Sequence, residues 1–323
     1  MPWTIDFPIL PLPDPISHSG KVLSMGSCFA QTIGSKMKNA KFDVLINPFG
    51  TIFHPINLAF LLDAVIFQDP LDPEGIVERE GLYSHYSFHS DLVAESPEAL
   101  AELYQKQIQS TYLQLKSASH LILTLGTAWI YEHESFGQVA NCHKQPQRLF
   151  DKKLTGLEEM KSAFSHVLHN ISQVFPQLKI VLTVSPVRHI KNGVAENQLS
   201  KSLLRVLCAE LEKSIYPISY FPAYEIMMDE LRDYRFYKSD LIHPSAEAEE
   251  YIWQKWKQAA FSSETQSKVK EIQSVHSDLA HRSFNPKSAS HQKFLQNLLA
   301  KLERLNTEFD FSEEIVEVKK QIG

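Results

Sequence analysis

The sequence predicts an α/β protein built on a doubly wound parallel sheet, and three observations predict it. Short apolar runs recur along the chain, longer amphipathic segments separate them, and the runs are apolar at nearly every position. Strands with that pattern are buried on both faces, whereas strands with one wet face alternate. Helices between such strands cover both faces of the sheet and make neighbouring strands parallel.

Five strands are expected, each closing at residues that suit a turn. They are 21–25, 42–46, 120–125, 179–184 and, more weakly, 218–221. The first closes at Gly26-Ser-Cys and the second at Asn-Pro-Phe-Gly. Glycine, proline and asparagine favour turns because of their backbone preferences, so both strands should stop there.

The amphipathic segments between these strands are expected to be helices. They are a stretch that ends near Ala40, then 55–67, a long helix from Pro97, then 157–174, 196–213 and a helix that begins near Ser245. The start of the long helix is the clearest, because Ser96 suits an N-cap and Pro97 suits the first helical position.

Two regions interrupt the alternation of strand and helix. Residues 68–95 and 131–156 are long, rich in aromatic residues and histidine, and weakly periodic. Long loops in a compact domain are usually functional or disordered. The density of aromatic residues favours an ordered lid or wall beside a pocket.

The C-terminal region, 263–323, is expected to be a helical extension of an α/β domain at 1–262. Apolar residues recur there at a spacing of three to four: Phe294, Leu295, Leu298, Leu299, Leu302 and Leu305. This stripe fits an amphipathic helix that docks on the core. It also fits a pair of helices that forms a homodimer, although it covers barely two heptads.

Composition excludes several classes of protein. The chain has 323 residues, of which 43% are hydrophobic, and a net charge of −6. The apolar content supplies a sizeable core and excludes wholesale disorder. We expect no nucleic-acid partner, because such proteins need a basic face.

The N-terminal sequence and the number of cysteines predict the cellular compartment of the protein. The first 20 residues carry acids and five prolines where a secretory signal would have a basic start and an unbroken apolar stretch. No apolar run approaches the roughly 18 residues of a membrane span. The chain has three cysteines, Cys28, Cys142 and Cys208, which are too few for a disulfide framework in a chain of this length. We therefore expect a cytoplasmic protein with room for a working thiol.

Chemically capable residues follow the expected strands. Because the carboxyl ends of parallel strands share one edge of the sheet, ligands bind there. The clusters are Gly26-Ser-Cys28, Asn47-Pro-Phe-Gly50, Gly126-Thr-Ala-Trp129, Ser185-Pro-Val-Arg-His189 and, beyond the last strand, Asp240-Leu-Ile-His-Pro244. Five such clusters predict a functional site at this edge.

Asp240 and His243 form the most suggestive pair. In an Asp-x-x-His turn before a helix, both side chains lie on the same side. The carboxylate can then accept the imidazole Nδ1 proton and leave Nε2 as a base. The alternative is a capping aspartate beside a surface histidine.

Ser27 and Cys28 occupy the turn after the first expected strand. A thiol at a helix N-terminus meets the positive end of the helix dipole, which lowers the thiol pKa. A histidine nearby would activate the thiol further. The structural alternatives are a small buried core residue for Cys28 and an N-cap for Ser27.

Motifs over residues 20–260 resemble the GSCFA domain family. They are Met25-Gly-Ser-Cys-Phe-Ala30, Asn47-Pro-Phe-Gly-Thr51, Gly126-Thr-Ala128, Val139-Ala-Asn-Cys-His-Lys144, Ser185-Pro-Val-Arg-His189, Phe221-Pro-Ala-Tyr-Glu225, and Asp233-Tyr-Arg-Phe-Tyr237 leading into Asp240-Leu-Ile-His-Pro244. That family is grouped with the SGNH (GDSL-like) hydrolases, which include esterases, lipases, thioesterases and acyltransferases. The resemblance implies a three-layer α/β/α, flavodoxin-like fold.

The resemblance also implies catalytic residues. The superfamily's Gly-Asp-Ser turn falls on Gly26-Ser27-Cys28, which makes Cys28 the expected nucleophile, or Ser27 if the match shifts by one residue. Its Asp-x-x-His falls on Asp240 and His243.

The oxyanion hole implied by the resemblance is incomplete. Backbone N–H groups of Cys28 and Gly50 would hold the oxyanion, and the third block of the superfamily falls on Gly126 and the residues after it. Ala128 stands where that block has an asparagine amide. Loss of one oxyanion donor typically costs about 2.7–4 kcal/mol of transition-state stabilisation. Asn141 or His189 could substitute.

Further substrate-binding residues are expected at the same edge. They are Asn47, beside Gly50, and the pair Arg188 and His189 after the fourth strand. Arg188 and His189 could bind an anionic or carbonyl group; the alternative is an ion pair with a neighbouring acid.

The leading hypothesis is an acyl-ester hydrolase or acyltransferase that acts on an acyl or acylated-glycan substrate without a cofactor. The sequence contains neither Gly-x-Gly-x-x-Gly nor a phosphate-binding loop with Lys-Ser/Thr. One alternative is a non-catalytic module that binds an acyl or glycan ligand. Another is a metal-dependent hydrolase that uses loop residues: His85, His89, His133, Cys142 and His143.

Overall fold

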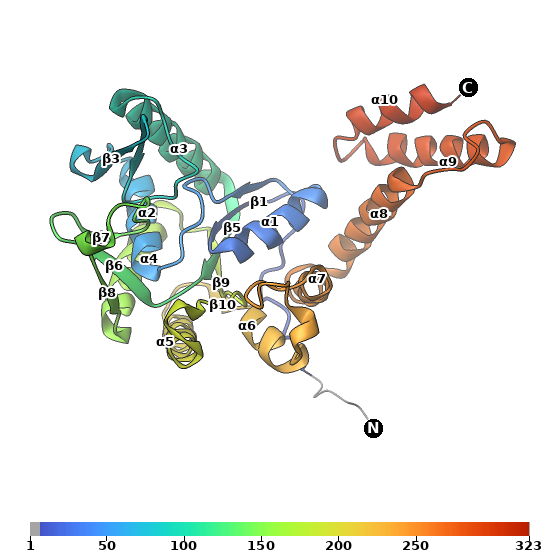
Figure 1. Cartoon of the computed structure of the whole chain (residues 1–323). Coiled ribbons are helices and arrows are strands. Elements are labelled where there is room, and N and C mark those ends of the chain that lie inside the picture. The colour runs from blue at the N-terminus through green and yellow to red at the C-terminus, as the bar shows by residue number, and fades with distance from the viewer. Residues whose placement is uncertain (1–6, 323) are drawn as a thin grey trace.

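A five-stranded parallel sheet lies at the centre of the computed structural model, which describes residues 7–322 (Figure 1). Its strands are β1 (Lys21–Gly26), β2 (Val44–Ile46), β5 (Ala118–Leu125), β9 (Lys179–Val184) and β10 (Ile218–Tyr220). They lie in the order β2-β1-β5-β9-β10, and every neighbouring pair is parallel. This is the flavodoxin-like order, so the predicted fold class is confirmed.

The expected strands match these five closely. The second begins two residues late, at Val44, because the Phe42 N–H donates to the Met37 carbonyl and closes the preceding helix. The register places Leu23 of β1 between Leu45 of β2 and Leu121 of β5. The carboxyl ends of β1 and β5 therefore meet where the strand order reverses, which is where open α/β sheets bind ligands.

Ten α-helices are assigned among the described residues. They are α1 (Cys28–Asn39), α2 (Pro55–Phe67), α3 (Pro97–Ser117), α4 (Leu157–Val174), α5 (Val194–Glu212), α6 (Ala223–Glu225), α7 (Ala246–Ala260), α8 (Ser263–Ala280), α9 (Ala289–Leu305) and α10 (Ser312–Gln321). Ser96 caps α3 by accepting the Ala99 N–H, as its sequence predicts.

The helices form two layers around the sheet. Leu121 and Leu123 of β5 belong to a core cluster with residues of α2, α3, α4 and α5. Ile122 points the other way, into a cluster with residues of α1 and α7 that includes Trp253 and Trp256. Alternate residues of β5 thus pack into two separate cores, one on each face of the sheet. This explains why the strand is apolar at nearly every position.

The two interrupting regions are ordered and contain short antiparallel strands. The first pairs β3 (Ile76–Arg79) with β4 (Leu82–His85). In the second, β6 (Trp129–His133) lies between β7 (Gly137–Val139) and β8 (Phe150–Leu154). Tyr86, Val139 and Phe150 form a small core where the two regions meet.

The C-terminal region forms an arm of three helices, α8, α9 and α10, that extends away from the sheet beyond α7 (Figure 1). Leu295, Leu298 and Leu302 pack on α8 and α10 in a core of the arm's own. The expectation that this stripe docks on the main core is therefore wrong, because α10 folds back and covers it. The homodimer and the boundary after residue 262 stay predictions.

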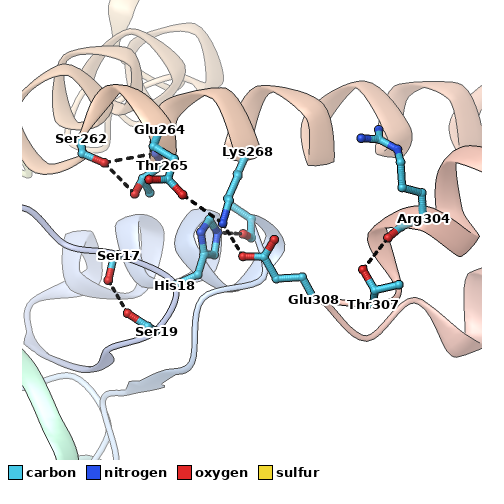
Figure 2. Close-up of polar contacts among 11 residues, drawn as sticks. Ser17, His18, Ser19, Ser262, Glu264, Thr265, Lys268, Arg304, Thr307 and Glu308 are labelled. Carbon is cyan, nitrogen blue, oxygen red and sulfur yellow. Dashed lines mark hydrogen bonds and ion pairs between the residues drawn. The ribbon is translucent and has the colours of Figure 1, made fainter.

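The arm meets the body beside His18, whose ring lies 4.7 Å from the ring of Phe309 in the arm. Figure 2 shows Lys268 of α8 paired with Glu264 and Glu308 beside the ring of His18. The His18 Nε2 lies 2.9 Å from the Ala40 carbonyl oxygen. No helix within residues 7–322 has the length and apolar character to cross a membrane.

Candidate active site

The turn between β1 and α1 is built around Gly26. Its φ is +136°, and a Cβ there would overlap the Thr124 carbonyl oxygen of β5. The Gly26 N–H donates to Asn47 Oδ1 over 2.9 Å, so Asn47 braces this turn from the end of β2. Only glycine fits this conformation and this approach, and it sets where Ser27 and Cys28 lie.

Ser27 and Cys28 have different environments. Ser27 is fully buried, and its Oγ accepts the Phe29 N–H over 3.3 Å as the N-cap of α1. Cys28 is partly exposed and lines a cavity at the sheet edge. Its backbone N–H, in the first turn of α1, has no hydrogen-bond acceptor on any other described residue.

Asp240 and His243 form the contact that their spacing predicts. Asp240 Oδ2 lies 2.7 Å from His243 Nδ1, and Oδ1 accepts the N–H groups of Ile242 and His243 over 2.8 and 3.0 Å. These hydrogen bonds lower the pKa of Asp240 to about 2. The ionised carboxylate favours a proton on Nδ1 and leaves Nε2 as the basic nitrogen.

One cavity of about 470 Å³ brings the early and late residues together. Its lining includes Cys28 from the start of α1 and His243 from the turn before α7. Three other residues expected at the site also line it, namely Asn141, Arg188 and His189. No hydrogen bond joins the Cys28 thiol to the His243 ring among the contacts of the described residues.

Two glycines expected at the site do not line this cavity. The Gly50 N–H donates to the Asn47 carbonyl over 2.8 Å, and the Gly126 N–H donates to the Phe53 carbonyl over the same distance. Both donors are occupied inside turns. The structure therefore corrects the expectation that Gly50 supplies an oxyanion donor, and it gives Asn47 a bracing role.

Comparison with known proteins decides the family. The family model described as the GSCFA family matches residues 21–256. The chain belongs to the GSCFA family. A second model, described as the GSCFA domain protein C-terminal domain, matches residues 272–323.

Comparison with solved structures finds a distant similarity. A crystal structure of the psychrotrophic esterase EstA from a Pseudoalteromonas species, inhibited by monoethylphosphonate, is similar at 11% sequence identity and a TM-score of 0.32. That similarity covers 74% of this chain and 96% of the esterase chain. No curated protein matches the sequence.

Two polar side chains of the GSCFA site could replace the missing asparagine amide. Ala128 is fully buried, and its N–H donates to Ser200 Oγ. Asn141 uses Oδ1 to accept the His143 N–H, while no hydrogen bond engages its Nδ2 within residues 7–322. His189 Nε2 is buried without a partner there. Burial lowers the pKa of His189 to about 3, so its ring is neutral with one N–H to donate.

The electrostatics of Cys28 differ from the sequence expectation. Burial raises the pKa of its thiol, and this outweighs the lowering by its own backbone N–H and by Lys201 and Lys238. The free GSCFA protein therefore holds a protonated thiol at neutral pH, instead of the thiolate that the helix N-terminus favours. A nearby base would be needed to ionise this thiol at neutral pH.

Sequence reasoning missed Lys201 of α5. The residue is fully buried, and its Nζ donates to the carbonyls of Gly126 and Ser185 over 2.7 Å each. It thus ties the loops after β5 and β9 together. The signal was its place on the apolar face of the helix, at helical spacing from Leu204 and Cys208.

The loop histidines do not form a metal site. Among the described residues, no three histidine, cysteine, aspartate or glutamate side chains are grouped to hold an ion. Both ring nitrogens of His85 are engaged, with the Asp72 carbonyl and with the Ser87 N–H. His143 bonds the His85 carbonyl instead of sharing a ligand with it. The metal alternative therefore lacks a set of donors in the part of the chain that the structure describes.

Proposed function

We propose that this GSCFA protein transfers an acyl group from an ester or thioester, with Cys28 as nucleophile and His243 as base. One observation carries the proposal: Cys28 and His243, from opposite ends of the domain, line the same cavity, while Asp240 holds the imidazole from behind. A nucleophile, a base and a group that orients the base make up the acyl-transfer arrangement. Ser27 is the weaker candidate because its Oγ is buried and caps α1.

In the first half-reaction, His243 Nε2 takes the Cys28 thiol proton while Sγ attacks the carbonyl carbon. The tetrahedral oxyanion lies by the free Cys28 N–H, with Asn141 Nδ2 and the His189 ring as further donors. Collapse breaks the bond to the leaving alkoxide or thiolate, which takes the proton back from His243. The acyl group is left on Cys28 as a thioester.

In the second half-reaction, water or an acceptor hydroxyl attacks the thioester and gives its proton to His243. The Cys28 sulfur then leaves and recovers that proton. The acid or the new ester departs, so atoms and charge balance. Asp240 stays ionised throughout, because its pKa is about 2, and it stabilises the imidazolium that forms twice.

A second candidate is a module that binds an acyl or glycan ligand on the same fold. The raised pKa of Cys28 and the lack of a hydrogen bond from its thiol to His243 favour this reading. Catalytic contacts often tighten only when substrate binds. Turnover therefore has to decide between the two.

The test is hydrolysis of 4-nitrophenyl acetate and of an acetyl thioester by the purified full chain. We expect Cys28→Ala to abolish turnover of both substrates. Ser27→Ala should lower the unfolding free energy by about 1 kcal/mol, because it removes an N-cap, but should keep turnover. Cys208→Ala serves as the control for removal of a thiol, because Cys208 is buried in a core cluster and does not line the cavity.

Three results would redirect the proposal. Turnover lost in Ser27→Ala but retained in Cys28→Ala moves the nucleophile to Ser27. A folded protein with no turnover of either ester supports the binding module. Loss of activity when a chelator is added supports the alternative of a metal-dependent hydrolase.

A further inference from the structure

The cavity is lined by cations but by no carboxylate. Lys152 of β8, Arg188 after β9 and Lys191 of the 3-10 turn η3 (Ile190–Asn192) all line it, and no aspartate or glutamate of residues 7–322 does. The whole chain, by contrast, carries a net charge of −6. The charge of the cavity lining is therefore opposite in sign to the net charge of the chain.

None of these three cations forms an ion pair with a carboxylate among the described residues. The Arg188 guanidinium lies 4.0 Å from the centre of the Tyr237 ring, and the Lys152 ammonium lies 5.4 Å from the Trp129 ring. Aromatic faces stabilise cations weakly and leave most of the charge uncompensated. The neighbouring Lys153 differs, because it pairs with Glu132 and Glu159.

The cations also act on one another. Burial, and secondarily the charge of Lys191, lower the pKa of Lys152. Lys152 and Lys191 are among the charges that lower the pKa of His189. Like charges held together in a partly desolvated cavity raise the free energy of the empty site, and a bound anion would lower it.

We propose that the substrate of this site carries a negatively charged group, a carboxylate, sulfate or phosphate, that binds beside Lys152 near the scissile ester. The aromatic side chains of Trp129 and Tyr131 flank that ammonium and favour an apolar segment next to the charge. This inference rests on the proposed function for its ester, whereas the charge preference can be measured by binding alone.

The first experiment compares matched esters in the wild-type full chain. One pair is 4-nitrophenyl hydrogen succinate and its neutral methyl ester, which place the charge on the acyl part. The other is 4-acetoxybenzoate and its methyl ester, which place it on the leaving group. We expect kcat/KM to be about tenfold higher for the anionic member of at least one pair, which is the value of one charge-assisted contact. Equal values in both pairs would overturn the inference.

The second experiment removes one charge. Lys152→Met removes the charge and keeps most of the length of the side chain, and we expect it to erase most of the preference for the anionic ester. Lys153→Met is the matched control on the same strand, and it should keep the preference. A preference that survives Lys152→Met or disappears in Lys153→Met counts against the placement beside Lys152.

A binding measurement separates this inference from the proposed function. Isothermal titration uses the amides N-(4-nitrophenyl)succinamic acid and 4-acetamidobenzoate, and the methyl ester of each. Tighter binding of an acid in wild type, lost in Lys152→Met, supports the inference even if no ester is hydrolysed. Hydrolysis of neutral esters with no difference in binding between acid and methyl ester supports the proposed function and overturns the inference.

Discussion

The thiol of Cys28 is subject to two opposing influences. The start of α1 stabilises a thiolate, whereas burial in the cavity wall disfavours charge. Burial prevails and raises the pKa of Cys28. The residue type and its position in the turn predict the first effect, but only the packed structure reveals the second.

Alkylation should therefore be slow at neutral pH. A thiol whose pKa lies above its ordinary value of about 8.5 has only a few per cent or less of thiolate at pH 7, and that fraction rises with pH. We expect the iodoacetamide rate at Cys28 to increase about tenfold per pH unit from 6 to 8. The measurement is mass spectrometry of labelled Cys28 in a Cys142→Ala background, because Cys142 is also partly exposed.

A rate that is already maximal at pH 7 would contradict this expectation and restore the thiolate that the sequence predicts. In that case His243→Ala tells whether the imidazole is responsible. A thiolate paired with His243 would react much more slowly in the variant, whereas a thiolate stabilised by the helix alone would not.

At the scale of elements, the β1–α1 turn depends on the close approach of Gly26 to β5. Gly26→Ala should lower the unfolding free energy by more than about 3 kcal/mol, because the new Cβ collides with the Thr124 carbonyl and φ is +136°. Gly81→Ala is the matched control: its φ is also positive, at +80°, but nothing lies within 4 Å of its Cβ. It should cost about 1 kcal/mol. If urea unfolding shows the same loss of unfolding free energy in both variants, the positive φ alone sets the cost, and the contact with the Thr124 carbonyl adds nothing.

Helix α5 contributes a buried charge. Burial lowers the pKa of Lys201 to about 7, against about 10.4 in an unfolded chain. Below pH 7 both states are protonated. Between about pH 7 and 10 the native state releases the proton and the unfolded state keeps it, so stability rises with pH.

This gives Lys201→Met a pH signature. The variant leaves the carbonyls of Gly126 and Ser185 without their donor, which costs about 1–3 kcal/mol for each. In urea unfolding at pH 6 to 9, we expect the advantage of wild type over Lys201→Met to grow above pH 7 by up to about 1.4 kcal/mol per pH unit. An advantage that is constant or shrinks as pH rises would mean that Lys201 stays charged.

The five sheet strands and the helices between them could be predicted because their apolar periodicity is set by burial on two faces. The strands β3, β4, β6, β7 and β8 could not, because short antiparallel strands with weak alternation look like loops. At the site, spacing alone predicts the contact between Asp240 and His243. Nothing in the sequence shows that the Gly50 N–H is occupied, because that depends on a turn hydrogen bond to Asn47.

At the scale of the whole molecule, the arm and the body have separate cores. Ile272 and Val275 of α8 belong to the core of the arm, whereas Val269, two turns or less before them, belongs to the core of α1 and α7. The sequence shows an apolar stripe but not which surface covers it. That depends on α10 turning back at Phe309 and Phe311, which join the core of the arm.

Lys41, just after α1, is the main link between the body and the end of the arm. Its Nζ pairs with Glu314 over 3.0 Å, donates to the Asp310 carbonyl and lies 4.2 Å from the centre of the Phe311 ring. Because φ at Lys41 is +63°, alanine is strained there as lysine is, and Lys41→Ala isolates the side chain. If the substitution removes about 1–2 kcal/mol of the free energy that holds the arm on the body, amide hydrogen exchange in the arm should be about 5–30-fold faster.

We expect this acceleration in α9 and α10 of Lys41→Ala, with exchange in β1 and β5 unchanged. Lys38→Ala is the control, since Lys38 is exposed near the end of α1 and forms no ion pair among the described residues. Hydrogen exchange with mass spectrometry reads both regions in one experiment. If exchange accelerates by the same factor in the arm and in the sheet, the two unfold as one unit. That result would argue against a domain boundary after residue 262. Acceleration confined to the arm would support that boundary, because the arm would open while the sheet that carries Cys28 stays closed.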